Sequence, residues 1–290
     1  MNDMTQQDFE YYQALLMQHS GLALTSEKSY LLKTRLTPVA SSLGYANLQD
    51  MTLDMRNKTD VVMTKKIVEA MTTNETSFFR DAKPFQNLIE MLPRLMEKNA
   101  ISKTIRIWSA ACSTGQEAYS IAMTLEEYFA DKPGWRYEIV GTDISENALS
   151  RARKGEFNQF EIQRGLTIQK MVQYFAQEGS NWRIKEHLQK HVSFQYANLL
   201  ENMSMIRKFD VVFCRNVLIY FNKETKAHVL NNIGCHMANE GILFLGACET
   251  IVNLEVPYNP MKNYNGLFEK RSESVPINKM QHSQSILNAS

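Results

Sequence analysis

The chain has 290 residues, with 32 Lys and Arg against 31 Asp and Glu, so its formal net charge at pH 7 is +1. This length provides for one large hydrophobic core or for two modest domains. The balanced charge gives no overall field that would attract nucleic acid or an anionic membrane, so neither is predicted as a partner.

The cysteine and hydropathy patterns indicate a cytoplasmic protein. None of the four cysteines forms a Cys-x-x-Cys pair or has a histidine at zinc spacing, which argues against a disulfide framework and against a metal site. No apolar run approaches the ~18–20 residues that span a bilayer, and the chain start lacks the basic and apolar regions of a signal peptide. We therefore expect reduced thiols and no direct membrane insertion.

Residues 1–72 are predicted to form a helical N-terminal domain. Its first helix begins at a capping box of Thr5 and Asp8, and Gly21 is placed to end it. The apolar face of this helix is expected to comprise Phe9, Tyr12, Leu16 and His19.

Two further helices are expected in this domain. One starts near Ser26 and ends near Gly44, and Pro38 should kink it or end it early because proline removes a backbone donor. The other is expected around residues 59–71. Residues 73–100 then form a linker and a connecting helix that begins near Pro84.

Between residues 101 and 271, strand-like and helix-like segments alternate, which predicts an α/β domain with a mainly parallel sheet. The strand at 105–109 leads into a turn of small residues and then a helix, where backbone N–H groups can meet a polar or anionic ligand. Gly115 is the only glycine in that turn, so the dinucleotide fingerprint Gly-x-Gly-x-x-Gly is missing.

Polar residues follow the later predicted strands. Asp143 ends the second strand, Asn198 ends the third, and Arg215 with Asn216 interrupts the fourth. Because ligands of open α/β sheets bind beyond the carboxyl ends of the strands, these side chains are expected to gather near the small-residue turn. An Asp143 that only caps the following helix would have the same sequence pattern.

Two segments depart from the alternation of strands and helices. Residues 155–190 are predicted to form a small β-insertion with a turn at 178–181 and a strand over 182–188. Residues 272–290 show no sustained period and are predicted to be a disordered tail.

Four sequence blocks, at 73–80, 108–117, 141–143 and 213–221, together resemble the CheR-type chemotaxis receptor methyltransferases. The resemblance covers about residues 5–270. It implies a Rossmann-like methyltransferase domain with an antiparallel β-insertion, preceded by the helical domain. It also implies transfer of a methyl group from S-adenosylmethionine (SAM) to glutamate side chains on the cytoplasmic helical bundle of chemoreceptors, leaving S-adenosylhomocysteine (SAH). The protein is expected to be a monomer.

The matching positions imply the site residues. Arg80 and Tyr220 would face the reacting groups. Cofactor contacts would come from Asn74, Thr76, Arg80, Glu117, Asp143, Asn198, Leu199, Arg215 and Asn216. A glutamate carboxylate, with a reference pKa of about 4.3, is already ionised at neutral pH, so its methylation needs no general base.

Two features depart from the family pattern. The basic stretch of Lys28, Lys33 and Arg35 is sparser than the family's receptor-facing stripe, and it also fits a merely solvated helix face. The turn at 177–181 is shorter than in members that grip a receptor's C-terminal tether. We therefore expect recognition of the receptor bundle without a C-terminal pentapeptide.

Three other functions fit parts of the sequence. The missing glycines argue against a nicotinamide-dependent oxidoreductase. The balanced charge, and the presence of Arg215 and Asn216 where an Asn/Asp-Pro-Pro-aromatic motif would stand, argue against a nucleic-acid methyltransferase. The presence of Arg80, Asp143 and Tyr220 disfavours a non-catalytic scaffold that only senses the cofactor.

Overall fold

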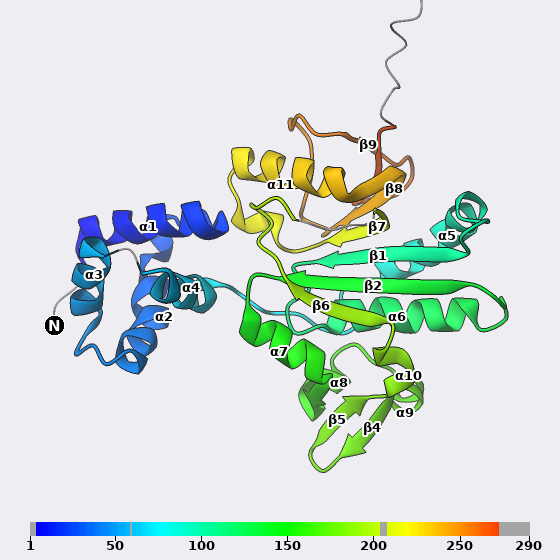
Figure 1. Ribbon diagram of the computed structural model, residues 1–290, viewed down its shortest axis with the longest axis horizontal. Coiled ribbons are helices and arrows are strands. Elements are labelled where there is room, and N and C mark those ends of the chain that lie inside the picture. The colour runs from blue at the N-terminus through cyan, green and yellow to red at the C-terminus, as the bar shows by residue number, and fades with distance from the viewer. Residues whose placement is uncertain (1–3, 59, 204–207, 273–290) are drawn as a thin grey trace, which may run out of the picture.

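The computed structural model describes residues 4–58, 60–203 and 208–272. A helical unit stands beside an α/β unit, and an extended segment after α4 joins them (Figure 1). The tail predicted for 272–290 lies outside the described residues, apart from Ser272.

The helical unit is built from short helices around one apolar core. The Thr5–Asp8 capping box is present, since each residue's side chain accepts a hydrogen bond from the other's backbone N–H. Gly21 ends the first helix in the left-handed region, with φ 72°. The elements are α1 (Gln6–Ser20), the 3-10 turn η1 (Ser26–Lys28), α2 (Ser29–Ser42), α3 (Leu48–Asn57) and α4 (Val61–Met71).

Three details of this unit differ from the sequence predictions. Helix α3 was not predicted, although Asn47 caps it by accepting a hydrogen bond from the Asp50 N–H. Helix α2 does not end at Pro38, which lies on the exposed face, where water can reach the carbonyl group that loses its partner. His19 is exposed rather than part of the apolar face.

The α/β unit contains a seven-stranded sheet in the order β6-β2-β1-β7-β8-β10-β9. From β6 to β8 neighbouring strands are parallel, whereas β10 pairs antiparallel with both β8 and β9. Strand β9 was not predicted. The strands are β1 (Thr104–Ala110), β2 (Arg136–Asp143), β6 (Val192–Tyr196), β7 (Phe209–Cys214), β8 (Met237–Leu245), β9 (Tyr258–Pro260) and β10 (Leu267–Lys270).

Helices cover both faces of this sheet. Alternate side chains of β1 enter different cores: Ile105 and Ile107 pack with α5 and α6, whereas Trp108 packs with α11 on the other face. The helices are α5 (Lys83–Lys98), α6 (Gln116–Phe129), α7 (Glu146–Lys154), the 3-10 turn η2 (Leu218–Tyr220) and α11 (Lys223–His236).

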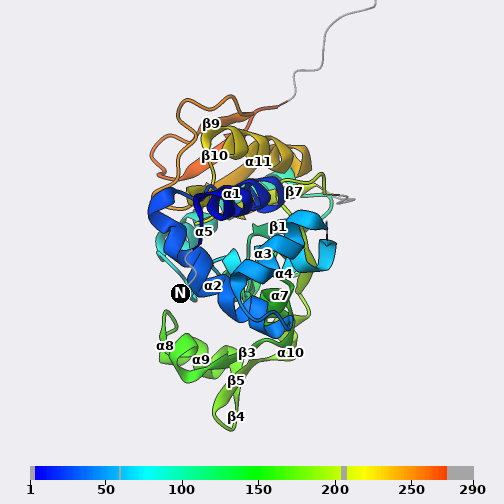
Figure 2. The ribbon, with the colours of Figure 1, turned by 90° about the vertical axis from the view of Figure 1, so that its left-hand side faces the viewer.

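The β-insertion is a separate antiparallel sheet in the order β3-β5-β4, at the end of the molecule away from α11 (Figure 2). Phe78 anchors it by packing edge-on against Phe157 and Phe175, with ring centroids 4.9 and 5.5 Å away. The strand predicted over 182–188 is shorter than expected and gives way to a helix. The elements are β3 (Glu156–Asn158), α8 (Gln159–Gln163), α9 (Ile168–Tyr174), β4 (Phe175–Glu178), β5 (Asn181–Ile184) and α10 (Glu186–Gln189).

The predicted fold class is confirmed: a parallel-dominated α/β sheet follows an N-terminal helical region and carries a small antiparallel insertion. The carboxyl ends of β1, β2, β6 and β7 face the helical unit (Figure 1). This arrangement positions the candidate site between the two units.

Candidate active site

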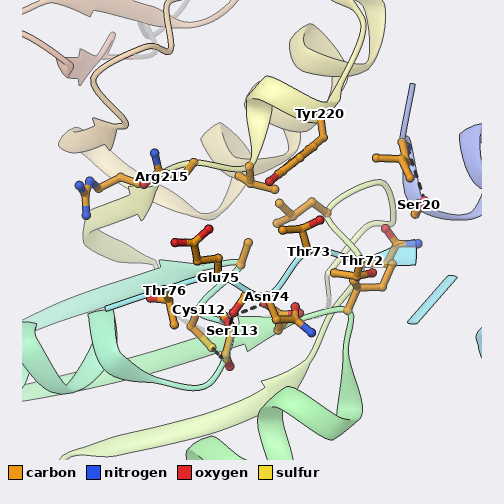
Figure 3. Close-up of a pocket in the computed structure, with 18 of the residues that line it drawn as sticks. Ser20, Thr72, Thr73, Asn74, Glu75, Thr76, Cys112, Ser113, Arg215 and Tyr220 are labelled. Atoms are coloured by element: carbon orange, nitrogen blue, oxygen red, sulfur yellow. Dashed lines mark hydrogen bonds between the residues drawn. The ribbon is translucent and has the colours of Figure 1, made fainter. Parts of the chain in front are cut away.

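Every residue that the resemblance assigned to the site lines one cleft between the helical unit and the carboxyl ends of the parallel strands. Figure 3 labels Asn74, Thr76, Arg215 and Tyr220 among them. The cleft encloses about 1050 Å³, part of it open solvent, which is enough for a nucleoside-sized ligand. These residues are Asn74, Thr76, Arg80, Glu117, Asp143, Asn198, Leu199, Arg215, Asn216 and Tyr220.

The turn after β1 reaches the cleft through an unusual backbone path. Ala111, Ser113 and Gly115 all have positive φ values, of 58°, 52° and 93°. At Gly115 an added Cβ would lie 3.0 Å from the Cβ of Ala152 in α7. This position therefore needs glycine for its conformation and for the close approach of α7, whereas the rest of the turn reaches the cleft without fingerprint glycines.

Asp143 ends β2 with its side chain inside the cleft wall and only 5% exposed. Its carboxylate accepts hydrogen bonds from the backbone N–H groups of Ser113, at 2.8 Å, and Ser145, at 2.9 Å. Burial raises the pKa of Asp143, and these N–H groups oppose that rise by stabilising the ionised form. The N-cap of α7 is Ser145, so the alternative in which Asp143 only caps this helix is wrong.

Arg215 is the central cation of the site, and its side chain is only 1% exposed. Its guanidinium pairs with Glu117 at 2.9 Å and with Asp81 at 2.6 Å, and it donates to the carbonyl oxygen of Arg80 at 3.0 Å. Glu117 also accepts a hydrogen bond from the Ser109 hydroxyl. Arg215 therefore ties the linker segment to the start of α6.

Residues 72–76, where α4 has ended and the linker begins, form one wall of the cleft. The carbonyl oxygen of Asn74 accepts a hydrogen bond from the Ser113 hydroxyl at 2.8 Å, and the Asn74 amide donates to the Ser145 hydroxyl at 3.3 Å. Tyr220 points into the cleft from the opposite side, as Figure 3 shows. Arg80 is half-buried and donates to the carbonyl oxygen of Glu75.

The helical unit also contributes directly to the cleft. Ser20, the last residue of α1, and Leu22, just after the helix, are among its lining residues. The Asn198 amide donates to the carbonyl oxygen of His19 at 2.8 Å, and the Ala23 N–H donates to the carbonyl oxygen of Tyr220 at 2.9 Å. No site residue was predicted in or near α1, because no local pattern there indicates a contact with a distant loop.

Charged residues outside the cleft also have structural partners. Arg35, one of the basic residues of α2, donates to the carbonyl oxygens of Met71 and Thr72 and to the Thr73 hydroxyl. It therefore binds the end of α4 and the start of the linker. Among residues 4–58, 60–203 and 208–272 no cluster of His, Cys, Asp and Glu is arranged to hold a metal ion, and no helix is long and apolar enough to cross a membrane.

Comparison with known families identifies the family of the protein that contains this cleft. The family model described as the SAM-binding domain of CheR methyltransferases matches residues 74–266. The chain belongs to the CheR methyltransferase family. Its cofactor is therefore SAM, and its activity is SAM-dependent methylation in chemotaxis.

Relatives in three bacteria extend this likeness over most of the chain. The chain is 37% identical over 265 residues to chemotaxis protein methyltransferase 1 of Pseudomonas aeruginosa, covering 90% of this chain and 96% of the relative. The Vibrio parahaemolyticus protein is 36% identical over 92% of this chain and 98% of its own length. The Escherichia coli protein is 32% identical over 85% of each chain. All three are chemotaxis protein methyltransferases.

Proposed function

We propose that this CheR methyltransferase transfers the methyl group of SAM to glutamate side chains of chemoreceptors, forming methyl esters and SAH. Membership of the family and the names of its relatives support a chemoreceptor acceptor. The observation that favours a carboxylate acceptor is the set of charged groups in the cleft. The described residues that line the cleft include two arginines, Arg80 and Arg215, and three acidic side chains that already have hydrogen-bond partners.

The acidic side chains of the cleft are already engaged. Glu117 accepts from Arg215 and Ser109, and Asp143 accepts from two backbone N–H groups. Glu75 pairs with Arg164 at 2.9 Å, and that hydrogen bond lowers the pKa of Glu75, which makes it a weaker base. No described lining residue is a histidine or a lysine.

This arrangement suits a nucleophile that needs no deprotonation. An amine acceptor would have to lose a proton before attack, whereas a glutamate carboxylate, with a reference pKa of about 4.3, is ionised at neutral pH. Charge is neutralised as the carboxylate attacks, so the protein has to align the reactants and exclude water. Alignment alone can supply roughly 7–11 kcal/mol.

The proposed residue roles follow from position in the cleft. SAM, when bound, supplies an electrophilic methyl group on a positively charged sulfur. Asp143, at the end of the second strand, would hold the ribose hydroxyls, and Arg80 would hold a carboxylate in a two-pronged hydrogen bond. Tyr220 would orient the attacking carboxylate through its hydroxyl. The remaining cofactor contacts would come from Asn74, Thr76, Glu117, Asn198, Leu199, Arg215 and Asn216.

We also propose how the chain divides its tasks. Residues 1–72 dock the receptor's cytoplasmic bundle. Residues 101–271 form the methyltransferase domain, which binds SAM and carries the insertion at 155–190. Residues 73–100 link these two domains. The protein works as a cytoplasmic monomer. Because Arg35 is bound to the end of α4, docking through the basic stretch of α2 has fewer charges available than the sequence indicates.

Recognition without a receptor tether is supported by the hairpin of the insertion. Strand β4 ends at Glu178 and β5 begins at Asn181, so the connection is a two-residue turn, with Gly179 at φ 61°. Such a turn has no extra loop with which to grip a peptide. Calorimetry with a receptor C-terminal pentapeptide should show no binding, and micromolar affinity would contradict this part of the proposal.

The acceptor is tested with methyl-labelled SAM and receptor-containing membranes. Label should enter the receptor and leave as methanol on treatment with base, which is the behaviour of a carboxyl methyl ester. Receptors whose methylation-site glutamates are replaced by alanine serve as the control. Label that resists base would show a different acceptor atom and would contradict the proposal.

A further inference from the structure

Glu249 lies behind the cleft, in the loop after β8, and is 9% exposed. One carboxylate oxygen accepts hydrogen bonds from the backbone N–H groups of Gly246, at 2.6 Å, and Asn216, at 2.8 Å. The other accepts from those of Val217, at 2.9 Å, and Leu218, at 2.7 Å. A single carboxylate therefore satisfies four backbone donors from two loops.

These donors need a partner because of how the chain turns after β7. Asn216 has a positive φ of 59°, and the chain then enters the 3-10 turn η2. The first N–H groups of a helical turn have no partner within it, and Val217 makes no side-chain cap bond. Glu249 supplies the missing acceptor. Its negative charge lies at the N-terminal end of η2, and the N-terminal end of a helical turn favours an anion.

Proposed site residues lie before and after the N–H groups of this segment that bind Glu249. Arg215 and Asn216 precede η2, and Tyr220 ends it. We propose that Glu249 is a positioning residue for methyl transfer: its carboxylate sets the backbone path that aims Asn216 at the cofactor and Tyr220 at the acceptor. This inference rests on the roles proposed above for Asn216 and Tyr220.

Gly246 provides a second, independent test of the same contact. A Cβ at this position would lie 2.7 Å from a carboxylate oxygen of Glu249 and 3.0 Å from the backbone nitrogen of Asn216. A Gly246→Ala variant therefore disturbs the Glu249–Asn216 contact without changing the chemistry of either side chain.

The first experiment compares Glu249→Gln with Glu255→Gln, which removes the same charge from an exposed position in the same region. The Gln amide nitrogen of the first variant would face two N–H donors. SAH affinity is measured by calorimetry on the full chain, at a temperature where circular dichroism shows each variant fully folded. We expect about tenfold weaker binding for Glu249→Gln and for Gly246→Ala, and a change below twofold for the control.

The second experiment separates positioning from a purely structural role. Turnover is measured for Glu249→Gln, Tyr220→Phe and the double variant. If Glu249 acts through Tyr220, its replacement should lower kcat about 10–100-fold with little change in the KM for receptor, and the double variant should be no slower than about the worse single variant. Multiplying effects in the double variant, or unchanged kcat in Glu249→Gln, would overturn the inference.

The two measurements keep this inference distinct from the proposed function. SAH binding requires no acceptor, so unchanged SAH affinity in both Glu249→Gln and Gly246→Ala overturns the inference whatever protein is methylated. Wild-type enzyme that binds SAH but labels no receptor glutamate would contradict the proposed function, while weakened SAH binding in the two variants would still support the positioning of Asn216. If Glu249→Gln does not fold, Gly246→Ala decides the question alone.

Discussion

The carboxylate of Asp143 shows, at the scale of single residues, how the cleft wall accommodates a buried acidic group. Burial raises its pKa, and the N–H groups of Ser113 and Ser145 favour the ionised form and orient both oxygens. The cost of burying this charge is thus offset in part before any ligand binds.

Replacement of Asp143 by alanine should weaken SAH binding about 10–100-fold, because the ribose would lose its proposed acceptor and two backbone donors of the cleft wall would lose their partner. Calorimetry on the folded protein measures the change. Asp131→Ala, which removes an exposed carboxylate after α6, is the matched control and should bind SAH normally. Unchanged affinity in Asp143→Ala would remove this residue from the proposed site.

At the scale of elements, a side chain of the helical unit is bound to the start of α7. Glu69 in α4 accepts hydrogen bonds from the Ser145 hydroxyl, at 3.0 Å, and from the Asn147 N–H, at 2.8 Å. A carboxylate at a helix N-terminus is favourable for α7. Because Ser145 also contacts Asp143 and Asn74, this contact joins α4 to the wall of the cleft that contains these two residues.

Removal of that charge should loosen the contact between the units. We expect Glu69→Gln to lose about 1 kcal/mol of unfolding free energy, which for a protein of this size lowers Tm by roughly 2–4 °C. Thermal unfolding followed by circular dichroism measures the shift. Glu97→Gln, at an exposed position of α5, is the control. A Glu69→Gln variant with the Tm of the wild type would show that the contact contributes nothing to stability.

At the scale of the whole molecule, the cleft is built from both units. Ser20 ends α1 and Leu22 follows it, whereas Asp143 ends β2 and Asn198 follows β6. A ligand that fills this cleft binds only when the units are docked. Ligand binding should therefore stabilise the docked arrangement as well as the sheet.

Hydrogen exchange tests this coupling. At a free SAH concentration of about 100 Kd, exchange should slow by up to ~100-fold at the Ala23 N–H, which bonds to Tyr220, and at the Ser113 N–H, which bonds to Asp143. The exposed turn at 178–181 should keep its exchange rate and is the internal control. Protection at Ser113 without protection at Ala23 would mean that SAH binds without engaging the helical unit.

Local and periodic features of this protein could be predicted from its sequence. The Thr5–Asp8 capping box, the alternation of strands and helices, and the polar residues after the parallel strands all depend on neighbours within a few residues. The gathering of Asp143, Asn198 and Arg215 in one cleft also follows, because the carboxyl ends of parallel strands share one edge. The roles of these residues in binding SAM stay predictions.

Only the tertiary structure decided which distant groups support that cleft. Asp81 pairs with Arg215, Glu69 binds the start of α7, and Glu249 holds the turn after β7, although no motif marks any of them. Helix α3 was missed although its Asn47 cap is a local signal. Helix α2 continues past Pro38 because the solvent exposure of that position overrides the local preference. Sequence periodicity reports which face of an element is buried, whereas a hydrogen bond between loops far apart in the chain depends on how the elements pack.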